Sequence, residues 1–559
     1  MIQHRPSFTR LLAILLVAGC AAWSGVAAAQ TPPNSADRAD PGLAREQRGD
    51  NDLAPARSEA PAVAAPEIRG AETGGAAVTA GAIRVEGAVA LSPADFAPAI
   101  EPYLGRPLDP ADLRALTRDI ADAARRRGFG LATAWIPQQS LIAGILTVHI
   151  EEGRIDAVEV EGPHRAAVER RLAPLVTGRP VRTAELERHL LLAGDLAGAS
   201  LGRARLLRRD GRNILFVSSA FDRVRGRASL DNGGTGSLGP VRATLGFDLG
   251  GLLIGGDRLS FGGVLTPAQP REYQYAEVAY SVPVGRNGTE VTLRGGIGHS
   301  AAGGRLRPEK LRGNSAEAGA DVTHPILRSR DASLWASIGF TLRDSHLERA
   351  GVPERDDRVV SAYASLFANA RAGEGRVRVR LSYVRGLDVL GATRHGAPLA
   401  SRDDAGGVFS KAEFWIQHDR PLGRGFSLDA RAFGQFASRP LLASEEMGLG
   451  GRQFLRAFDY WEVAGDRGAA AVVELRYDLR DSLPNPLRRA QFYLYADAGR
   501  VTNLRGGLGG GTLASAGGGV RVWLRNGFDA GVEIGVPLTD SPFNASPGPR
   551  LSFRISKQF

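Results

Sequence analysis

The sequence predicts a transmembrane β-barrel of about sixteen antiparallel strands that follows two small α+β units and a short helical segment. Three observations lead to this prediction. They are an export signal at the amino terminus, a tandem repeat of strands and helices over residues 81–221, and alternating strands over residues 222–559. At 559 residues the chain is too long for one ordinary domain, which favours several units.

Residues 1–29 have the pattern of a secretory signal peptide. A basic start leads into an apolar run from Leu11 to Gly19, and small residues at 27–29 precede the expected cleavage site. The mature chain is therefore expected to leave the cytoplasm. Cys20, the one cysteine, lies inside this signal, so cleavage there leaves no thiol for a disulfide or a metal. A lipoprotein site ending at Cys20 is the alternative.

Two segments of low complexity separate the signal from the first globular unit. Residues 30–48 are expected to hold a short helix, because Asp40 suits the cap and Pro41 the first helical position. Residues 49–80 are rich in alanine, proline, glycine and charge. Such a composition cannot bury a core, so this stretch is predicted to be a flexible linker.

Residues 81–153 show the order strand, helix, helix, strand, strand. Ile83 and Val85 share one face of the first strand, and Asp109 caps a helix whose apolar positions recur at helical spacing. Residues 154–221 repeat the pattern more weakly, with a strand at 154–160, helices at 164–175 and 183–193, and a last strand at 213–217. Two related α+β units in tandem are therefore expected.

From residue 222 the chain changes to short alternating strands between glycine-rich turns. In Arg376–Tyr383, arginines and serine occupy one face and valine, leucine and tyrosine the other. An apolar outer face and a polar inner face are typical of a membrane barrel. A strand with its turn uses about twenty residues, so residues 222–559 provide about sixteen strands. The final strand alternates in the same way and ends on Phe559.

Composition and motifs argue against several other functions. The net charge is +10, yet an exported protein has little access to nucleic acid, so basic residues are expected to line a wet lumen or to face lipopolysaccharide. The nine histidines form no metalloprotease motif, and no phosphate-binding loop or serine elbow is present. We therefore expect no enzyme, no cofactor and no metal. The acidic pair Glu151–Glu152 ends a strand and is expected to be solvated.

These features together resemble the transporter component of two-partner secretion systems, the haemolysin-activator or haemagglutinin-exporter type, over nearly the whole chain. Local matches are Gly128–Gln139, Glu152–Ile155, and Leu230–Asn232 with Gly255–Leu259. The resemblance implies a plug helix (30–48), a linker (49–80), two POTRA domains (81–153 and 154–221) and a sixteen-stranded barrel (222–559). In that reading Phe559 resembles the signal recognised by the barrel-assembly machinery.

The most specific match is Gly450–Phe458, which resembles the family's inward-folded loop. The family tip reads Val-Arg-Gly-Tyr or Phe, whereas this chain has Arg456, Ala457 and Phe458. Alanine resists the positive backbone dihedrals that glycine permits, so the tip conformation is open. The family pairs the arginine with a barrel-wall aspartate, here Asp497, which shares the luminal parity of its strand. We expect a bidentate Arg456–Asp497 ion pair.

The resemblance implies a pore in the outer membrane that exports an unfolded partner exoprotein, bound by the periplasmic POTRA domains, without ATP. Two alternatives stay open. A passive porin shares the basic lumen but has no need of the tandem units. An insertase of the same superfamily folds barrels instead of exporting a partner, and its members usually have another number of POTRA domains and no plug segment.

Overall fold

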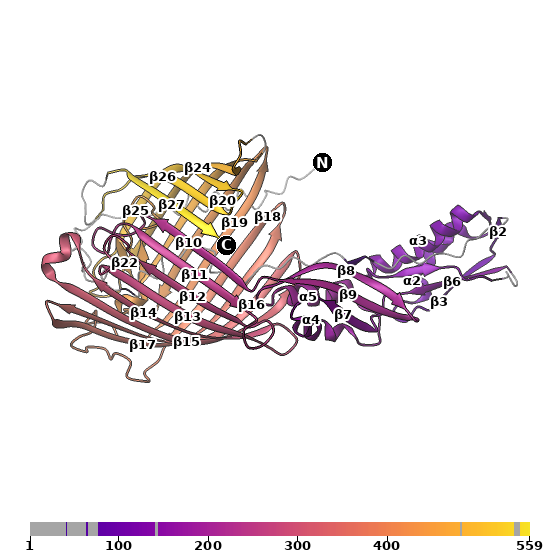
Figure 1. Ribbon diagram of the computed structural model, residues 1–559, viewed down its shortest axis with the longest axis horizontal. Coiled ribbons are helices and arrows are strands. Elements are labelled where there is room, and N and C mark those ends of the chain that lie inside the picture. The colour runs from indigo at the N-terminus through magenta and orange to yellow at the C-terminus, as the bar shows by residue number, and fades with distance from the viewer. Residues whose placement is uncertain (1–40, 42–62, 65–76, 140–143, 481–482, 542–547) are drawn as a thin grey trace.

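The computed structural model describes residues 41, 63–64, 77–139, 144–480, 483–541 and 548–559. The chain forms a closed barrel and an elongated arm of two α/β modules that extends from one end of it (Figure 1). The predicted signal peptide lies outside the described residues. So does the predicted helix at 30–48, apart from Pro41, which is buried. No helix among the described residues has the length and apolar character needed to cross a membrane.

The first module packs two helices on a small sheet. Its elements are β2 (Val78–Thr79), β3 (Ala82–Glu86), α2 (Pro93–Ile100), η4 (Glu101–Tyr103), β4 (Pro107–Leu108), α3 (Pro110–Arg126), β5 (Thr133–Trp135) and β6 (Ile145–Glu151). As predicted, Asp109 caps α3, accepting from the backbone N–H of Ala111 and Asp112 at 2.7 and 2.8 Å. Strand β6 lies between β3 and β5, and α3 buries its apolar stripe against this sheet.

Glu152 differs from the expectation of a solvated residue. Its side chain is buried, and its carboxylate accepts hydrogen bonds from the backbone N–H groups of Val89, Ala90 and Leu91 at 2.8–2.9 Å. A buried carboxylate is stable where it satisfies several backbone donors that would otherwise have no partner. Glu152 therefore fixes the turn between β3 and α2, a contact 61–63 residues away in sequence.

The second module contains β7 (Ala157–Glu161), α4 (Arg165–Leu172), η5 (Ala173–Leu175), α5 (Thr183–Gly194), β8 (Ala199–Arg209) and β9 (Arg212–Phe221). Both predicted helices are present. Strand β8 was not expected, and it forms a hairpin with β9. A register shift between Leu201 and Ala204 interrupts β8. This break spoils the alternation by which sequence patterns identify a strand.

Two short stretches within the predicted linker, 49–80, form strands in the structure. Residues Val63–Ala64 form strand β1, which pairs in parallel with Ala204 and Arg205 at the edge of β8. Val63 also packs against the core of the second module. At the other end, β2 pairs with β4, and Ala80 is fully buried in the first module. Short segments of this kind become strands because a sheet edge offers them backbone partners, which the local sequence does not reveal.

The barrel closes with sixteen antiparallel strands, as predicted. They are β10 (Val224–Asp231), β11 (Arg242–Gly250), β12 (Arg258–Leu265), β13 (Tyr273–Val284), β14 (Thr289–Ala301), β15 (Leu311–Arg328), β16 (Ala332–Arg349), β17 (Val352–Ala372), β18 (Gly375–Gly386), β19 (Ser410–Gly423), β20 (Phe426–Ala437), β23 (Arg467–Leu479), β24 (Leu487–Thr502), β25 (Gly511–Leu524), β26 (Phe528–Pro537) and β27 (Arg550–Gln558). A short 3₁₀ helix, η6 (Gly304–Glu309), lies between β14 and β15. Strand β27 pairs with β10 to close the ring.

The outer and inner faces of the barrel have opposite chemistry. Large apolar side chains such as Ile338, Leu366 and Leu494 are exposed outward, whereas the opposite parity carries charged, small and polar side chains. Because β10 follows the second module directly, its first residues mark the end of the barrel near the modules. The loop 438–466, which joins β20 to β23, therefore begins and ends at the far end.

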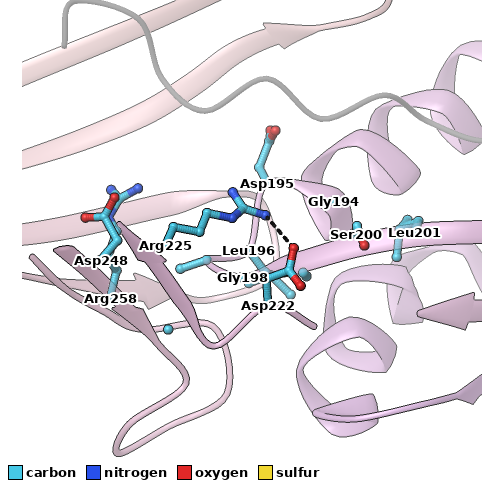
Figure 2. Close-up of a pocket in the computed structure, with 13 residues that line it drawn as sticks. Gly194, Asp195, Leu196, Gly198, Ser200, Leu201, Asp222, Arg225, Asp248 and Arg258 are labelled. Atoms are coloured by element: carbon cyan, nitrogen blue, oxygen red, sulfur yellow. Dashed lines mark ion pairs between the residues drawn. The ribbon is translucent and has the colours of Figure 1, made fainter. Parts of the chain in front are cut away.

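The second module is docked on the near end of the barrel (Figure 1). Arg328 at the end of β15 donates to both carboxylate oxygens of Asp195 at 2.8 Å. Arg188 on α5 donates to the carbonyl oxygens of Pro325 and Ile326 at 2.8 and 3.2 Å. Beside these contacts lies a polar cavity of about 250 Å³, where Arg225 pairs with Asp222 at 3.9 Å (Figure 2). Direct ion pairs and backbone contacts thus fix this module against the barrel.

Candidate functional site

The loop between β20 and β23 folds into the barrel and packs on its inner wall. It contains η7 (Ala443–Glu445) and a hairpin of β21 (Met447–Leu449) and β22 (Val463–Gly465). Gly450 and Gly451 have φ of 107° and 99°, which turn the chain toward the wall. The loop and the wall share one buried core, which comprises Met447, Leu449, Phe454, Leu455, Ala457, Phe458, Val463, Ala470, Val472, Tyr493, Tyr495, Val501 and Leu513.

Arg456 lies at the tip of this loop, with its side chain 5 % exposed. Its Nη1 donates to Glu474 Oε2 at 3.0 Å and to Glu533 Oε2 at 2.8 Å. The guanidinium carbon stands 3.4 Å from the ring centroid of Tyr495, a close cation–π contact. Nε and Nη2 make no hydrogen bond within the described structure. Stacking and two carboxylates therefore hold this buried cation, which leaves part of its donor capacity unused.

Asp497 lies on the inner wall and next to Arg456, as expected, but the bidentate pair is not formed. Its Oδ2 is 3.7 Å from Arg456 Nε and accepts the backbone N–H of Arg456 at 3.2 Å. The other carboxylate oxygen accepts from the Ser515 hydroxyl. Asp497 thus holds the backbone of the tip by a hydrogen bond and does not form a bidentate pair with the guanidinium. The bidentate pair does not form because the guanidinium stacks on Tyr495 and donates to Glu474 and Glu533 instead.

An ion-pair network surrounds the tip, and it continues along the wall from Arg476 to Asp429 and Asp419 at 3.1 and 3.4 Å. Glu474 is fully buried and receives Arg476 at 2.6 Å and Arg521 at 2.7 Å in addition to Arg456. Glu533 also accepts the Tyr493 hydroxyl at 2.8 Å. Each of these buried charges has a partner of opposite sign, which makes burial of the network tolerable. The site is therefore a buried network of ion pairs that holds the tip of the loop against the wall.

The backbone strain that an alanine at position 457 would cause is not present in the structure. Positive φ falls on Leu455, at 59°, and Ala457 is absent from the residues with positive φ. Alanine is therefore accommodated at this position without cost to the backbone. Phe458 is buried as expected, and its carbonyl accepts from Arg550 Nη1 at 2.7 Å, which joins the tip to β27.

Glycines on the wall make room for the tip. A Cβ atom at Gly535 would stand 2.7 Å from the Tyr495 hydroxyl and 3.2 Å from Ala457. A Cβ at Gly519 would stand 2.6 Å from the Tyr493 hydroxyl. Larger residues there would push the tyrosines and the tip into the lumen. The glycines of β25 and β26 therefore shape the seat of the loop.

A second network at the far end of the barrel holds the base of the loop. Arg402, in the connection 387–409, contacts Glu446 at 2.6 Å and Asp466 at 2.9 Å. Asp466 is fully buried and also accepts the backbone N–H groups of Leu441 and Leu504, both at 2.7 Å. Burial alone would lower the pKa of Arg402, but the adjacent carboxylates raise it above its ordinary value.

Phe559, the terminal residue, lies at the closing seam of the barrel. Its backbone exchanges hydrogen bonds with Gly226 at 2.7 and 3.0 Å, and its ring meets Phe247 edge-on with centroids 5.6 Å apart. A Cβ atom at Gly226 would come within 2.1 Å of this ring. The ring is 57 % exposed on the outer side. Phe559 therefore contributes to strand closure in the finished barrel.

Sequence reasoning missed Glu533, Arg521 and Arg402 as members of these networks. Charged residues of luminal parity were a usable signal for the first two, since Arg521 lies on β25, next to the strand of Asp497, and Glu533 lies on β26, one strand further along the same wall. Arg402 had no such signal, because it lies in a long connection whose course only the packed structure defines. Among the described residues, no cluster of His, Cys, Asp and Glu is arranged to hold a metal ion.

Fold and site together define a class of protein: an outer-membrane barrel with periplasmic POTRA-type modules and an inward-folded loop held by an arginine. The POTRA domain model of the ShlB type matches residues 78–153. The family model described as haemolysin secretion/activation protein ShlB/FhaC/HecB matches residues 210–522. The chain belongs to this family of two-partner secretion transporters. Its modules accordingly lie in the periplasm, and the far end of the barrel faces outward.

The relatives in the sequence comparison have low sequence identity to this chain, but the similarity extends over most of its length. The heme/hemopexin transporter protein HuxB of Haemophilus influenzae (strain 86-028NP) is 22% identical over 412 residues, which cover 72% of each chain. The outer membrane transporter CdiB of Dickeya dadantii (strain 3937) is 22% identical over 485 residues, covering 80% of this chain and 81% of CdiB. Among solved structures, CdiB from Escherichia coli superposes with a TM-score of 0.71 at 21% identity, over 95% of this chain and all of CdiB.

Proposed function

We propose that this chain is an outer-membrane pore that recognises an unfolded partner exoprotein, of adhesin or haemolysin type, and exports it through the barrel without ATP. The observation that carries the proposal is the closed sixteen-stranded barrel with a loop locked inside it by the Arg456 network. A barrel of this size has room for a lumen, whereas one of eight strands is filled by its own side chains. A loop that is held inside the lumen by ion pairs can restrict the pore at rest and move when the exoprotein passes.

Recognition is proposed to occur by strand addition to the periplasmic modules. Backbone hydrogen bonding at a sheet edge accepts many sequences, which suits an unfolded partner. The β8 edge of the second module already pairs with β1. In the described structure, β3 and β5 border the sheet of the first module, and β7 borders that of the second. These edges are the sites that we propose for the exoprotein, together with the adjoining strand–helix grooves.

The role proposed for the loop network follows from its incomplete bonding. Arg456 sits among three carboxylates but leaves Nε and Nη2 without hydrogen bonds. A buried network of this kind specifies one position of the loop, yet its net contribution is modest because desolvation opposes the ion pairs. The loop can therefore be held in a secretion-competent position and still shift when cargo passes.

The proposed export is tested by comparing proteins at the cell surface and in the medium of a strain lacking this chain with those of the complemented strain. We expect one large exoprotein to be absent outside the cell without the chain and to return with it. Unchanged surface and medium proteins, with a normal amount of chain in the complemented strain, would contradict export. A general loss of outer-membrane barrels would instead support an insertase.

The segment 30–48 is proposed to be a plug. Pro41 is buried, and its carbonyl accepts from the Tyr273 hydroxyl at 3.3 Å, which places this residue against β13. A lumen that is open from end to end should conduct more ions when the plug is removed. We expect purified chain lacking residues 30–48 to show larger and steadier openings in planar bilayers than the mature chain. Equal conductance of the two proteins would argue against a plug.

Other assignments are proposals of the same kind. The domain boundaries are 1–29 for the signal peptide, 49–80 for the linker, 81–153 and 154–221 for the POTRA domains and 222–559 for the barrel. Lipopolysaccharide and the barrel-assembly machinery are proposed partners, the latter through Phe559, whose deletion should lower the amount of chain in the outer membrane. We propose no enzymatic activity, no cofactor and no nucleic-acid partner.

An insertase of the same superfamily stays the second candidate. BamA from Haemophilus ducreyi lacking POTRA domains 1–3 superposes with a TM-score of 0.52 at 13% identity, over 86% of this chain. This likeness concerns the fold alone. The family match and the higher TM-score with CdiB favour export. A passive porin would not need the two periplasmic modules.

A further inference from the structure

Four aromatic side chains form a continuous row on the inner wall of the barrel. In the strand register, Trp335 stands opposite Phe367, and Trp415 stands opposite Phe433. Arg380 lies between the two pairs, opposite both Phe367 and Trp415. The four rings, together with Arg380 on β18, thus form a row across five neighbouring strands, β16 to β20. The alternate positions on these strands carry outward-facing residues such as Ile338, Leu366, Leu381, Phe414 and Phe436.

Polar rows border this aromatic row on both sides. On one side the register gives Ser337, Ser365, Ser382, Glu413 and Gln435. On the other side it gives Asn369, Arg378, Gln417 and Arg431. The wall therefore carries a narrow apolar stripe between hydrophilic margins, and three of its rings, those of Trp335, Phe367 and Trp415, are only 5–7 % exposed beneath neighbouring side chains.

The aromatic row rises from the periplasmic end of the barrel toward the inward loop. Trp335 lies near the start of β16, beside Arg328, whose guanidinium is 5.5 Å from its ring. Because strands of a barrel are tilted, a row of directly opposed residues climbs the wall. Phe433, at the upper end, packs against the buried core of the loop. The row thus connects the docking site of the second module with the loop that carries Arg456.

Trp415 supplies a hydrogen-bond donor that has no partner. Its side chain is 6 % exposed, and its indole Nε1 makes no hydrogen bond within the described structure. Buried indole N–H groups usually find an acceptor. The rings of Trp335 and Phe367 stand 5.6 Å apart, and Arg380 lies over Phe367 at 5.6 Å. A ligand that displaced this long, flexible side chain would meet ring faces and a free donor together.

We propose that the aromatic row is the track along which the exported polypeptide moves, which rests on the proposed export function. An extended chain presents an apolar side chain at many alternate positions and carbonyl acceptors throughout. Ring faces bind such side chains with little dependence on sequence, and Trp415 Nε1 donates to a passing carbonyl. The polar margins solvate the remaining backbone. Contacts that are individually weak allow the chain to advance instead of arresting it.

The track is tested in cells that make the full-length chain and the exoprotein whose secretion depends on it. The photo-crosslinker p-benzoylphenylalanine replaces Phe367 or Phe433, and a stable folded domain fused to the end of the exoprotein arrests it in the pore. Trp523 is the matched control, since this luminal ring lies off the row, under Arg489 at 4.4 Å. We expect adducts to the exoprotein from positions 367 and 433, and about tenfold fewer from position 523.

A conservative variant provides a second measurement. Trp415→Phe keeps the ring but removes the donor, so the barrel should assemble normally while the export rate falls about threefold. Trp523→Phe should export at the normal rate. Equal adducts from all three positions, or none from 367 and 433 while export proceeds, would overturn the track. So would normal export by Trp415→Phe. If secretion of no exoprotein depends on the chain, the proposed export function itself is wrong. The comparison of cells that lack the chain with complemented cells shows this before any variant is made.

Discussion

Arg456→Ala is expected to lower exoprotein export about tenfold or more while the barrel still assembles in the outer membrane. The substitution removes the cation that contacts Glu474 and Glu533 and stacks on Tyr495. Breaking a buried ion pair costs about 3–5 kcal/mol. The loss here falls at the lower end of that range, because Glu474 keeps Arg476 and Arg521 and Glu533 keeps the Tyr493 hydroxyl.

The measurement compares exoprotein in the medium with heat-modifiable chain in the outer membrane. Arg456→Lys should be impaired as well, because a lysine ammonium cannot stack as a plane on Tyr495 and reach two glutamates. Arg452→Ala is the control on the same loop, since Arg452 pairs with Asp231 at 3.1 Å and its side chain is 33% exposed. Normal export by Arg456→Ala at normal abundance would show that the network has no part in secretion.

Separating Asp195 from Arg328 is expected to loosen the second module from the barrel. The pair is bidentate, and the Arg328 side chain is only 7 % exposed. Either single alanine variant leaves one charge in this interface without its partner, at a cost of about 3–5 kcal/mol. The double variant removes both charges, so we expect it to be less damaging than either single variant. Damage that simply adds would contradict a buried, coupled pair.

The looseness is measurable as a distance distribution between two spin labels. One label is placed at Asp210 in the β8–β9 turn and the other at Arg424 between β19 and β20, both exposed positions. Cys20 is the one native cysteine and lies in the predicted signal, so introduced cysteines should be labelled selectively. The single variants should broaden the distribution. Arg209→Ala, which removes an exposed ion pair to Glu159 in the same module, should leave it unchanged.

The elements that sequence patterns predicted well are those with strong local periodicity. Alternation in Arg376–Tyr383 and its counterparts led to sixteen strands because lipid and water select opposite faces of every strand. The Asp109 cap located α3 through local chemistry. By contrast, β1 was assigned to a linker and β8 was missed, since one depends on a distant sheet edge and the other contains a register shift.

The candidate site shows the same division. Parity alone placed Asp497 on the inner wall, and the loop motif placed Arg456 and Phe458 at the tip. The expected fork between Arg456 and Asp497 is not formed, because Tyr495, Glu474 and Glu533 determine where the guanidinium lies. The burial of Glu152 was likewise unexpected, since its three donors come from a turn more than 60 residues away.

The sequence by itself determined the class of this protein, its barrel, its two modules and the residues at the loop tip. These follow from hydrophobic periodicity and short motifs, which act over a few residues. Only the tertiary structure decided which carboxylates hold Arg456, how the second module docks through Asp195 and Arg328, and that Trp335, Phe367, Trp415 and Phe433 share one row. Each of these depends on strand register and on closure of the barrel, which bring together residues far apart in the chain.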